Sequence, residues 1–224
     1  MILPGLANIE IIERTHKSVV MGFKGGLGIV EGNQFRAEVH QVCRACSVDF
    51  NIDVVVNQER GIAGMFAGHV EESYLKGVAF ARTVYQTNIP DQVDVAVLNA
   101  YPKDIDLIQS ENAFNLYRSV KRAFVADGGK VVLMTASQEG MGRHGLFEPG
   151  GRLHRKPTRK RWLGNRELLL FCPTVLPQDA AQLYWAEYPV LNTWPEVIGE
   201  LRKTFSEKCR VAVFPCSSLQ LGMS

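Results

Sequence analysis

The sequence predicts an α/β fold: a parallel or mixed sheet with helices on both faces, preceded by the remainder of a second α/β domain. Strand-like and helix-like segments alternate almost throughout the 224 residues. Beyond residue 92 the strands are separated by helices, which is the pattern of a parallel sheet. Asn88-Ile-Pro-Asp91 interrupts the alternation, so we place a domain boundary after residue 88. The expected organisation is a partial first domain at 1–88, an α/β domain at 89–214 and a tail at 215–224.

The first expected helix carries a histidine on its apolar face. The chain opens with Met1-Ile-Leu-Pro-Gly5, as if a strand or an active-site loop had been cut at Met1. Asn8 should then cap a short helix. Ile9, Ile12 and His16 share one face of it, at i, i+3 and i+7, so His16 should point inward. An inward histidine is either a core residue or a ligand, and the spacing alone favours the core.

The remaining elements follow from hydrophobic periodicity. The first domain should contain helices at 34–47 and 69–85 and strands at 50–56 and 62–67. The second should contain strands at 93–98, 130–135, 168–172 and 210–214, and helices at 104–125, 179–187 and 195–205. Gly128-Gly129 is expected to terminate the helix at 104–125.

Composition excludes some classes of protein. The chain contains no run of about 20 apolar residues, so it should not span a membrane. The N-terminus lacks the basic-then-apolar pattern of a signal peptide. Five cysteines, an odd number, predict reduced thiols in a cytoplasmic protein. A net charge of +2 argues neither for nor against a polyanionic partner.

In a parallel sheet, ligands bind at the carboxyl ends of the strands. That rule selects the loops 99–104, which includes Tyr101, and 138–145, which includes His144. Gln109 and Asn112 lie three residues apart on one helix face just beyond the first loop. They are either a polar surface pair or substrate contacts.

Three other motifs have plain structural interpretations. Cys43-x-x-Cys46 falls on the apolar stripe of a helix and has no second Cys-x-x-Cys, which favours core packing over zinc. Lys24 with Gly25-Gly-Leu-Gly28 is not a nucleotide-binding fingerprint, and we interpret it as a flexible turn. The basic segment 152–161 could contact nucleic acid or an anionic cofactor, but a solvated loop or interdomain surface fits a chain that is not basic elsewhere.

Taken together, the motifs resemble the nickel-dependent lactate racemase family and related 2-hydroxyacid racemases and epimerases. The matching segments occur in the family's order over nearly the whole chain. They are Met1-Ile-Leu-Pro-Gly5 through His16, Gly32-Asn33 with Arg36, 50–57 with Gly64-Met-Phe-Ala-Gly68, Asn99-Ala-Tyr-Pro-Lys-Asp104 with Gln109, and 138–145.

The resemblance implies a nickel ion held in a pincer nucleotide that is attached to a lysine, with a hydride moved reversibly to and from the substrate's alpha carbon. His16 aligns with the nickel-ligating histidine, and imidazole suits nickel. This alignment reverses the interpretation of His16 as a core residue. Gln109 aligns with a substrate-region glutamine, and Tyr101 belongs to the same substrate-binding motif.

Three departures from the family pattern affect the expected activity. The anchoring lysine would fall immediately before Met1, and the two histidines that act as general acid and base would lie further upstream. We therefore expect no catalytic residue within the chain. The family's substrate-binding lysine is Asn112 here, which can hydrogen-bond a carboxylate without a charge-assisted bond. A different alignment register would place Arg118 and Lys121 at the glutamine and lysine positions.

We therefore interpret the chain as the C-terminal portion of a lactate-racemase-like isomerase, inactive alone, whose substrate is a small 2-hydroxy acid. A separate chain would supply the missing N-terminal half, unless the start codon is misassigned. The main alternative is a non-catalytic binding module that uses the basic segment 152–161. A membrane partner is not expected, and nucleic acid is not favoured.

Overall fold

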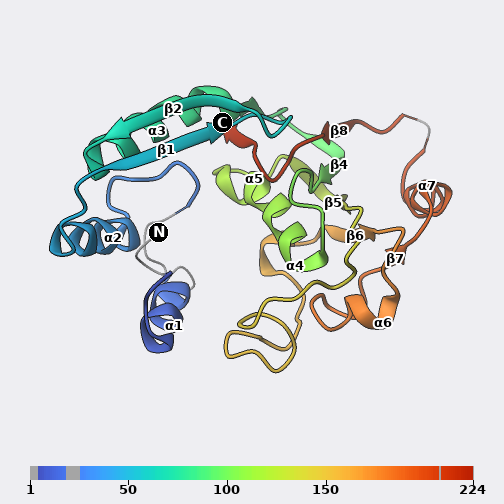
Figure 1. Cartoon of the computed structure of the whole chain (residues 1–224). Coiled ribbons are helices and arrows are strands. Elements are labelled where there is room, and N and C mark those ends of the chain that lie inside the picture. The colour runs from blue at the N-terminus through green and yellow to red at the C-terminus, as the bar shows by residue number, and fades with distance from the viewer. Residues whose placement is uncertain (1–4, 19–25, 207, 224) are drawn as a thin grey trace. The chain divides into compact units, whose positions relative to one another are not determined.

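The computed structural model describes residues 5–18, 26–206 and 208–223. It divides into two compact units, Met1–Gln86 and Thr87–Ser224, and Figure 1 labels their elements. The termini of the predicted opening segment, residues 1–4, and Lys24-Gly25 of the predicted glycine turn lie outside the described residues. Among the described helices, none is long and apolar enough to cross a membrane.

Two capped helices begin the first unit. Helix α1 spans Ile9–Ser18, and the side chain of Asn8 accepts a hydrogen bond from the Ile11 amide at 3.0 Å, which confirms the predicted cap. Helix α2 spans Gln34–Ala45 and is capped by Asn33. It ends earlier than predicted because the chain turns into positive φ at Ser47.

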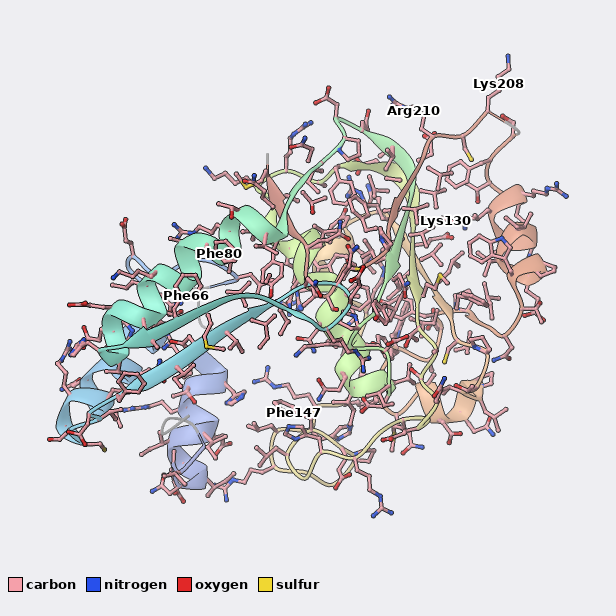
Figure 2. The ribbon with its side chains drawn as sticks, turned by 45° about the horizontal axis from the view of Figure 1, so that its top comes forward. Phe66, Phe80, Lys130, Phe147, Lys208 and Arg210 are labelled. Carbon is pink, nitrogen blue, oxygen red and sulfur yellow. The ribbon has the colours of Figure 1, made fainter. Side chains whose placement is uncertain are left out.

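The predicted strand pair and the helix that follows it are confirmed. Strands β1 (Asn51–Val56) and β2 (Ile62–Gly68) are antiparallel, and α3 (Val70–Tyr85) packs on one face of them. Phe66 on β2 and Phe80 on α3 meet with ring centroids 5.5 Å apart (Figure 2). A Cβ on Gly64 would lie 2.6 Å from the Phe80 ring, so a glycine there lets helix and hairpin approach closely.

The second unit is built on a five-stranded, fully parallel sheet with the order β7-β6-β5-β4-β8, as predicted for this half of the chain. A small additional sheet pairs β3 (Gln86–Asn88) with β9 (Leu221–Met223). The strands of the main sheet are β4 (Val93–Asn99), β5 (Val125–Met134), β6 (Glu167–Phe171), β7 (Val190–Leu191) and β8 (Val211–Phe214).

The long helix predicted at 104–125 is wrong. The segment folds as α4 (Leu107–Ser110), a 3-10 turn (Glu111–Ala113) and α5 (Phe114–Ser119). Gly128-Gly129 does not end a helix but forms a bulge inside β5, where Val93 pairs with Val125 and Val95 with Lys130. Gly128 has φ +74°, and a Cβ on Gly129 would lie 2.6 Å from the Asp94 carbonyl oxygen, so the bulge needs both glycines.

The helix predicted at 179–187 is also largely wrong. Only α6 (Pro177–Ala180) forms, and turns follow it. Ala180, Tyr184 and Tyr188 are nevertheless buried, so their spacing of four residues marks a surface that faces the core without a continuous helix. The helix predicted at 195–205 is confirmed as α7 (Trp194–Arg202), which begins with a capping box of Thr193 and Glu196.

Helices cover both faces of the sheet, as predicted. One face carries the larger core, in which Phe114 and Leu116 of α5 pack against Leu98 and Leu133. The other face packs against α7 through Val197 and Leu201. The edge strand β8 continues this second face with Val211 and Val213, which are exposed.

Candidate active site

The two loops selected by sequence are bonded together at the carboxyl end of the sheet. The loop after β5 donates backbone hydrogen bonds to the loop after β4, from Ser137 to Asp104 at 2.7 Å and from Glu139 to Ile105 at 2.9 Å. Leu107 returns one to the Gly140 carbonyl at 3.1 Å. The two predicted loops therefore form one rim next to α4, as expected for the carboxyl ends of neighbouring parallel strands.

Asp106 fixes the start of α4 at this rim. It is 8% exposed, and its Oδ1 accepts a hydrogen bond from the Gln109 amide at 2.7 Å. A Cβ on Gly142 would lie 2.4 Å from Asp106 Cγ, so the second loop passes directly against this carboxylate. Asp106 and Gly142 together set where Gln109 leaves the rim. Our sequence analysis missed both, although Asp106 stands at the spacing of a helix N-cap before Gln109.

A chain of buried hydroxyl groups lies beneath the rim. Ser110 Oγ donates to the Asp106 carbonyl oxygen at 2.6 Å and lies 2.6 Å from Thr135 Oγ1. Thr135 Oγ1 lies 2.9 Å from Ser137 Oγ. All three side chains are buried, so this network holds α4 to the end of β5 and gives the rim a rigid floor. The sequence signal for it is the Thr-Ala-Ser run directly after a buried strand.

The structure brings Tyr101, Gln109 and Asn112 into the segment that follows β4. Tyr101 is partly buried, and its backbone oxygen accepts from Ser218 Oγ at 2.9 Å. Gln109 and Asn112 are both partly buried. The Asn112 side-chain amide donates to the Gln109 carbonyl oxygen at 2.8 Å, and its Oδ1 accepts from Asn115 at 3.4 Å. Asn112 is thus bonded within its own helix, whereas the backbone cap on Asp106 positions Gln109.

The residues of the alternative register lie farther along the chain. Arg118 is exposed on the last turn of α5 and bonds Asn115 Oδ1 at 2.8 Å. Lys121 is exposed beyond the end of that helix.

His144 organises its own loop. Its Nδ1 accepts from the Leu146 amide at 3.4 Å, and its ring meets the Phe147 ring edge-on with centroids 4.8 Å apart. Phe147 is labelled in Figure 2. The position agrees with the sequence prediction, and the described contacts are those of a residue that shapes a loop.

His16 is exposed, so the prediction that it points inward is wrong. The face of α1 that meets the small core of the first unit contains Ala7, Ile11 and the buried Thr15. The His16 Nδ1 lies 2.7 Å from the Ile12 carbonyl oxygen, and because a carbonyl only accepts, Nδ1 carries the proton. This fixes the tautomer and leaves the lone pair of the neutral ring on Nε2.

No group of three or more histidine, cysteine or acidic side chains within the described ranges could hold a metal ion. Cys43 is buried beside Val39, as predicted. Cys46 is not a core residue: it is exposed and forms the C-cap of α2. Gly28, in the described part of the predicted glycine turn, has φ +70° and forms a turn with Leu27.

The basic segment 152–161 is tied to the second unit by its own cations. Lys160 Nζ bonds both carboxylate oxygens of Glu111, at 2.8 and 2.9 Å, and lies 5.2 Å from the centre of the Phe114 ring. Arg159 donates to the carbonyl oxygens of Gly164 and Arg166, at 2.7 and 2.9 Å. These contacts support the interpretation as a structural surface loop.

Comparison with known proteins adds evidence independent of this geometry. No family model matches the chain. Lactate racemase from Thermoanaerobacterium thermosaccharolyticum is 28% identical over 156 residues, which cover 65% of this chain and 34% of the racemase. Lactate racemase from Lactiplantibacillus plantarum is 22% identical over 148 residues, again covering 65% of this chain and 34% of the relative. The chain is a partial homologue of lactate racemase.

Solved structures show that this lactate racemase homologue shares the racemase fold. The lactate racemase apoprotein from T. thermosaccharolyticum matches with a TM-score of 0.74 at 18% identity, over 99% of this chain and 57% of that chain. A protein from Thermotoga maritima matches with a TM-score of 0.58 at 10% identity, over 93% of this chain and 58% of that one. The lactate racemase homologue therefore spans about a third of the length of its curated relatives by sequence, and little more than half of the solved racemase by structure.

Proposed function

We propose that this lactate racemase homologue forms part of a 2-hydroxyacid racemase or epimerase, and that the 224 residues alone are inactive. The observation that carries the proposal is homology to two lactate racemases, together with the rim that positions Gln109 at the carboxyl end of the sheet. On this proposal Gln109 and Tyr101 contact a small 2-hydroxy acid, and Asn112 changes substrate choice relative to a lysine.

His16 would be the nickel ligand within these residues. An exposed imidazole whose Nδ1–H is bonded to a carbonyl is arranged as metal-ligating histidines usually are, with the second ring nitrogen facing the metal. The chemistry that a nickel-pincer nucleotide supplies when bound is reversible acceptance of hydride from the substrate's alpha carbon. The described residues hold no cluster for a metal, so the other ligands, the anchoring lysine and the acid/base histidines would come from outside them.

The residues of the second unit would then bind and orient the substrate. Gln109 can donate its side-chain amide to a carboxylate or hydroxyl oxygen. The buried hydroxyl network keeps its backbone in place, which limits the reorganisation needed on binding. All five cysteines are free, which supports a reducing compartment, and we place the protein in the cytoplasm.

Metal binding provides the first test. We expect Ni²⁺ to raise the thermal midpoint of the chain, by the equivalent of about 2.7 kcal/mol at a metal concentration 100 times the dissociation constant. His16→Ala should lose this stabilisation, because it removes the only proposed nickel ligand, and His144→Ala should retain it. Equal stabilisation of wild type and His16→Ala would contradict the assignment.

Activity provides the second part of the same test. The purified chain should not interconvert D- and L-lactate with or without nickel, as measured by chiral chromatography. Racemisation by the 224 residues alone would overturn the proposed inactivity while leaving the homology intact.

A further inference from the structure

The sheet formed by β1 and β2 has one covered face and one exposed apolar face. In the antiparallel register Ile52 lies opposite Ala67 and Val54 opposite Met65, so these side chains project to the same side. Ile52, Val54 and Met65 are 57%, 50% and 58% exposed. We call this surface the hairpin face. Its large apolar residues are Phe50, Ile52, Val54, Ile62 and Met65.

The polarity of this sheet is the reverse of a sheet that faces water. An antiparallel sheet with one solvated side normally points its polar residues outward. Here the polar residues of β1 face α3: Asn51 donates to Asp53 at 2.6 Å and to the buried Ser73 at 2.9 Å. The apolar alternation points away from the helix. Both strands are also edges of this two-stranded sheet, so each has unpaired backbone groups along one side.

A contiguous apolar surface of this kind marks an interaction site. A two-stranded hairpin is also marginal by itself and needs further strands or packing for independent stability. The covered side already has its packing, through Phe66 and Phe80 (Figure 2). The unmet requirement therefore lies on the hairpin face and at the two strand edges.

We infer that the hairpin face is the docking surface for the part of the racemase fold that these 224 residues do not contain. The solved racemase matches 99% of this chain, hairpin included, while 57% of that chain is matched, so the remainder of its fold has no counterpart here. That remainder is the occupant for which the comparison gives evidence, and an apolar face beside open strand edges suits a segment that adds strands to the sheet and packs across it. The inference rests on the homology and not on the proposed nickel chemistry.

The test supplies the missing part in trans. The probe is a polypeptide made of the residues of T. thermosaccharolyticum lactate racemase that have no counterpart in the structural match. It is co-expressed with the affinity-tagged 224-residue chain, and the complex is measured by native mass spectrometry and by binding titration. We expect a 1:1 complex.

Charge reversal of apolar contact separates the hairpin face from other exposed surface. Val54→Lys with Met65→Lys, an opposed pair in the register, should weaken the complex at least tenfold. The matched control is Val211→Lys with Val213→Lys on β8, where the valines are 48% and 62% exposed. It should bind like wild type. All four sites are exposed, so circular dichroism of both variants should match that of wild type.

Three outcomes would overturn the inference. The probe fails to co-purify with the wild-type chain, or the Val54/Met65 variant binds it as tightly as the β8 control. In the third, sedimentation shows a homodimer that the Val54/Met65 variant dissociates and the probe does not displace, which would make a second copy the occupant. None of these results depends on nickel, so failure here is distinguishable from failure of the proposed function.

Discussion

Tyr117 places a hydroxyl group in the larger core of the second unit without a hydrogen-bond partner among the described residues. Its ring packs against Phe124 and Trp162, with centroids 5.0 and 4.9 Å apart. Burial raises the pKa of this phenol, while the nearby Arg166 acts in the opposite direction. A buried hydroxyl with no partner costs free energy that an apolar ring of the same shape would not.

Removing that hydroxyl should therefore stabilise the fold. We expect Tyr117→Phe to leave the free energy of unfolding unchanged or raise it by up to about 1 kcal/mol. Tyr184→Phe is the matched control, because the buried Tyr184 hydroxyl donates to the Leu107 carbonyl oxygen at 3.5 Å, and its loss should destabilise by about 0.5–1.5 kcal/mol. All three tryptophans lie in this unit, so urea unfolding followed by tryptophan fluorescence reports both changes. A Tyr117→Phe variant less stable than Tyr184→Phe would refute the account.

At the scale of elements, the rim depends on close approach between a loop and a helix start. Gly140 and Gly142 both have positive φ, +68° and +86°. Their surroundings differ: nothing lies within 4 Å of a Cβ on Gly140, whereas a Cβ on Gly142 would meet Asp106. The two positions thus share backbone strain and differ in steric contact.

Alanine substitution at these two glycines should separate strain from contact. Gly140→Ala should cost about 1–2 kcal/mol from the left-handed backbone alone. Gly142→Ala should cost about 1–3 kcal/mol more, because Asp106 must move and α4 loses its cap. Urea unfolding measures the difference. If both variants lose the same stability, the contact between Gly142 and Asp106 does not hold the rim together.

At the scale of the whole molecule, the basic segment distinguishes an enzyme part from a nucleic-acid-binding module. Lys160 is 17% exposed and bonded to Glu111, and Arg159 bonds backbone carbonyl groups. Cations committed to such bonds are not available to phosphates, and the net charge of +2 supplies no broad positive field.

Neutralising the segment should therefore affect stability and not binding. We expect Lys160→Met to lower the free energy of unfolding by about 1–2 kcal/mol, because Glu111 loses its partner. Arg155→Gln with Lys156→Gln, at exposed positions of the same segment, should change it by less than about 0.5 kcal/mol. Fluorescence anisotropy with a labelled oligonucleotide should detect no salt-sensitive binding in any of them. Salt-sensitive binding that Lys160→Met abolishes would revive the alternative function.

The sequence by itself determined the α/β class, the parallel sheet and the two loops of the rim, because hydrophobic periodicity and strand order depend on local pattern. Only the tertiary structure decided that Gly128-Gly129 is a bulge, because a glycine pair ends a helix or bends a strand depending on what lies beside it. It likewise decided which face of α1 is buried, since Ala7, Ile11 and Thr15 face the small core and His16 does not. Asp106 and the hydroxyl network went unpredicted because their partners lie about 25–36 residues away in sequence and meet only where parallel strands end together.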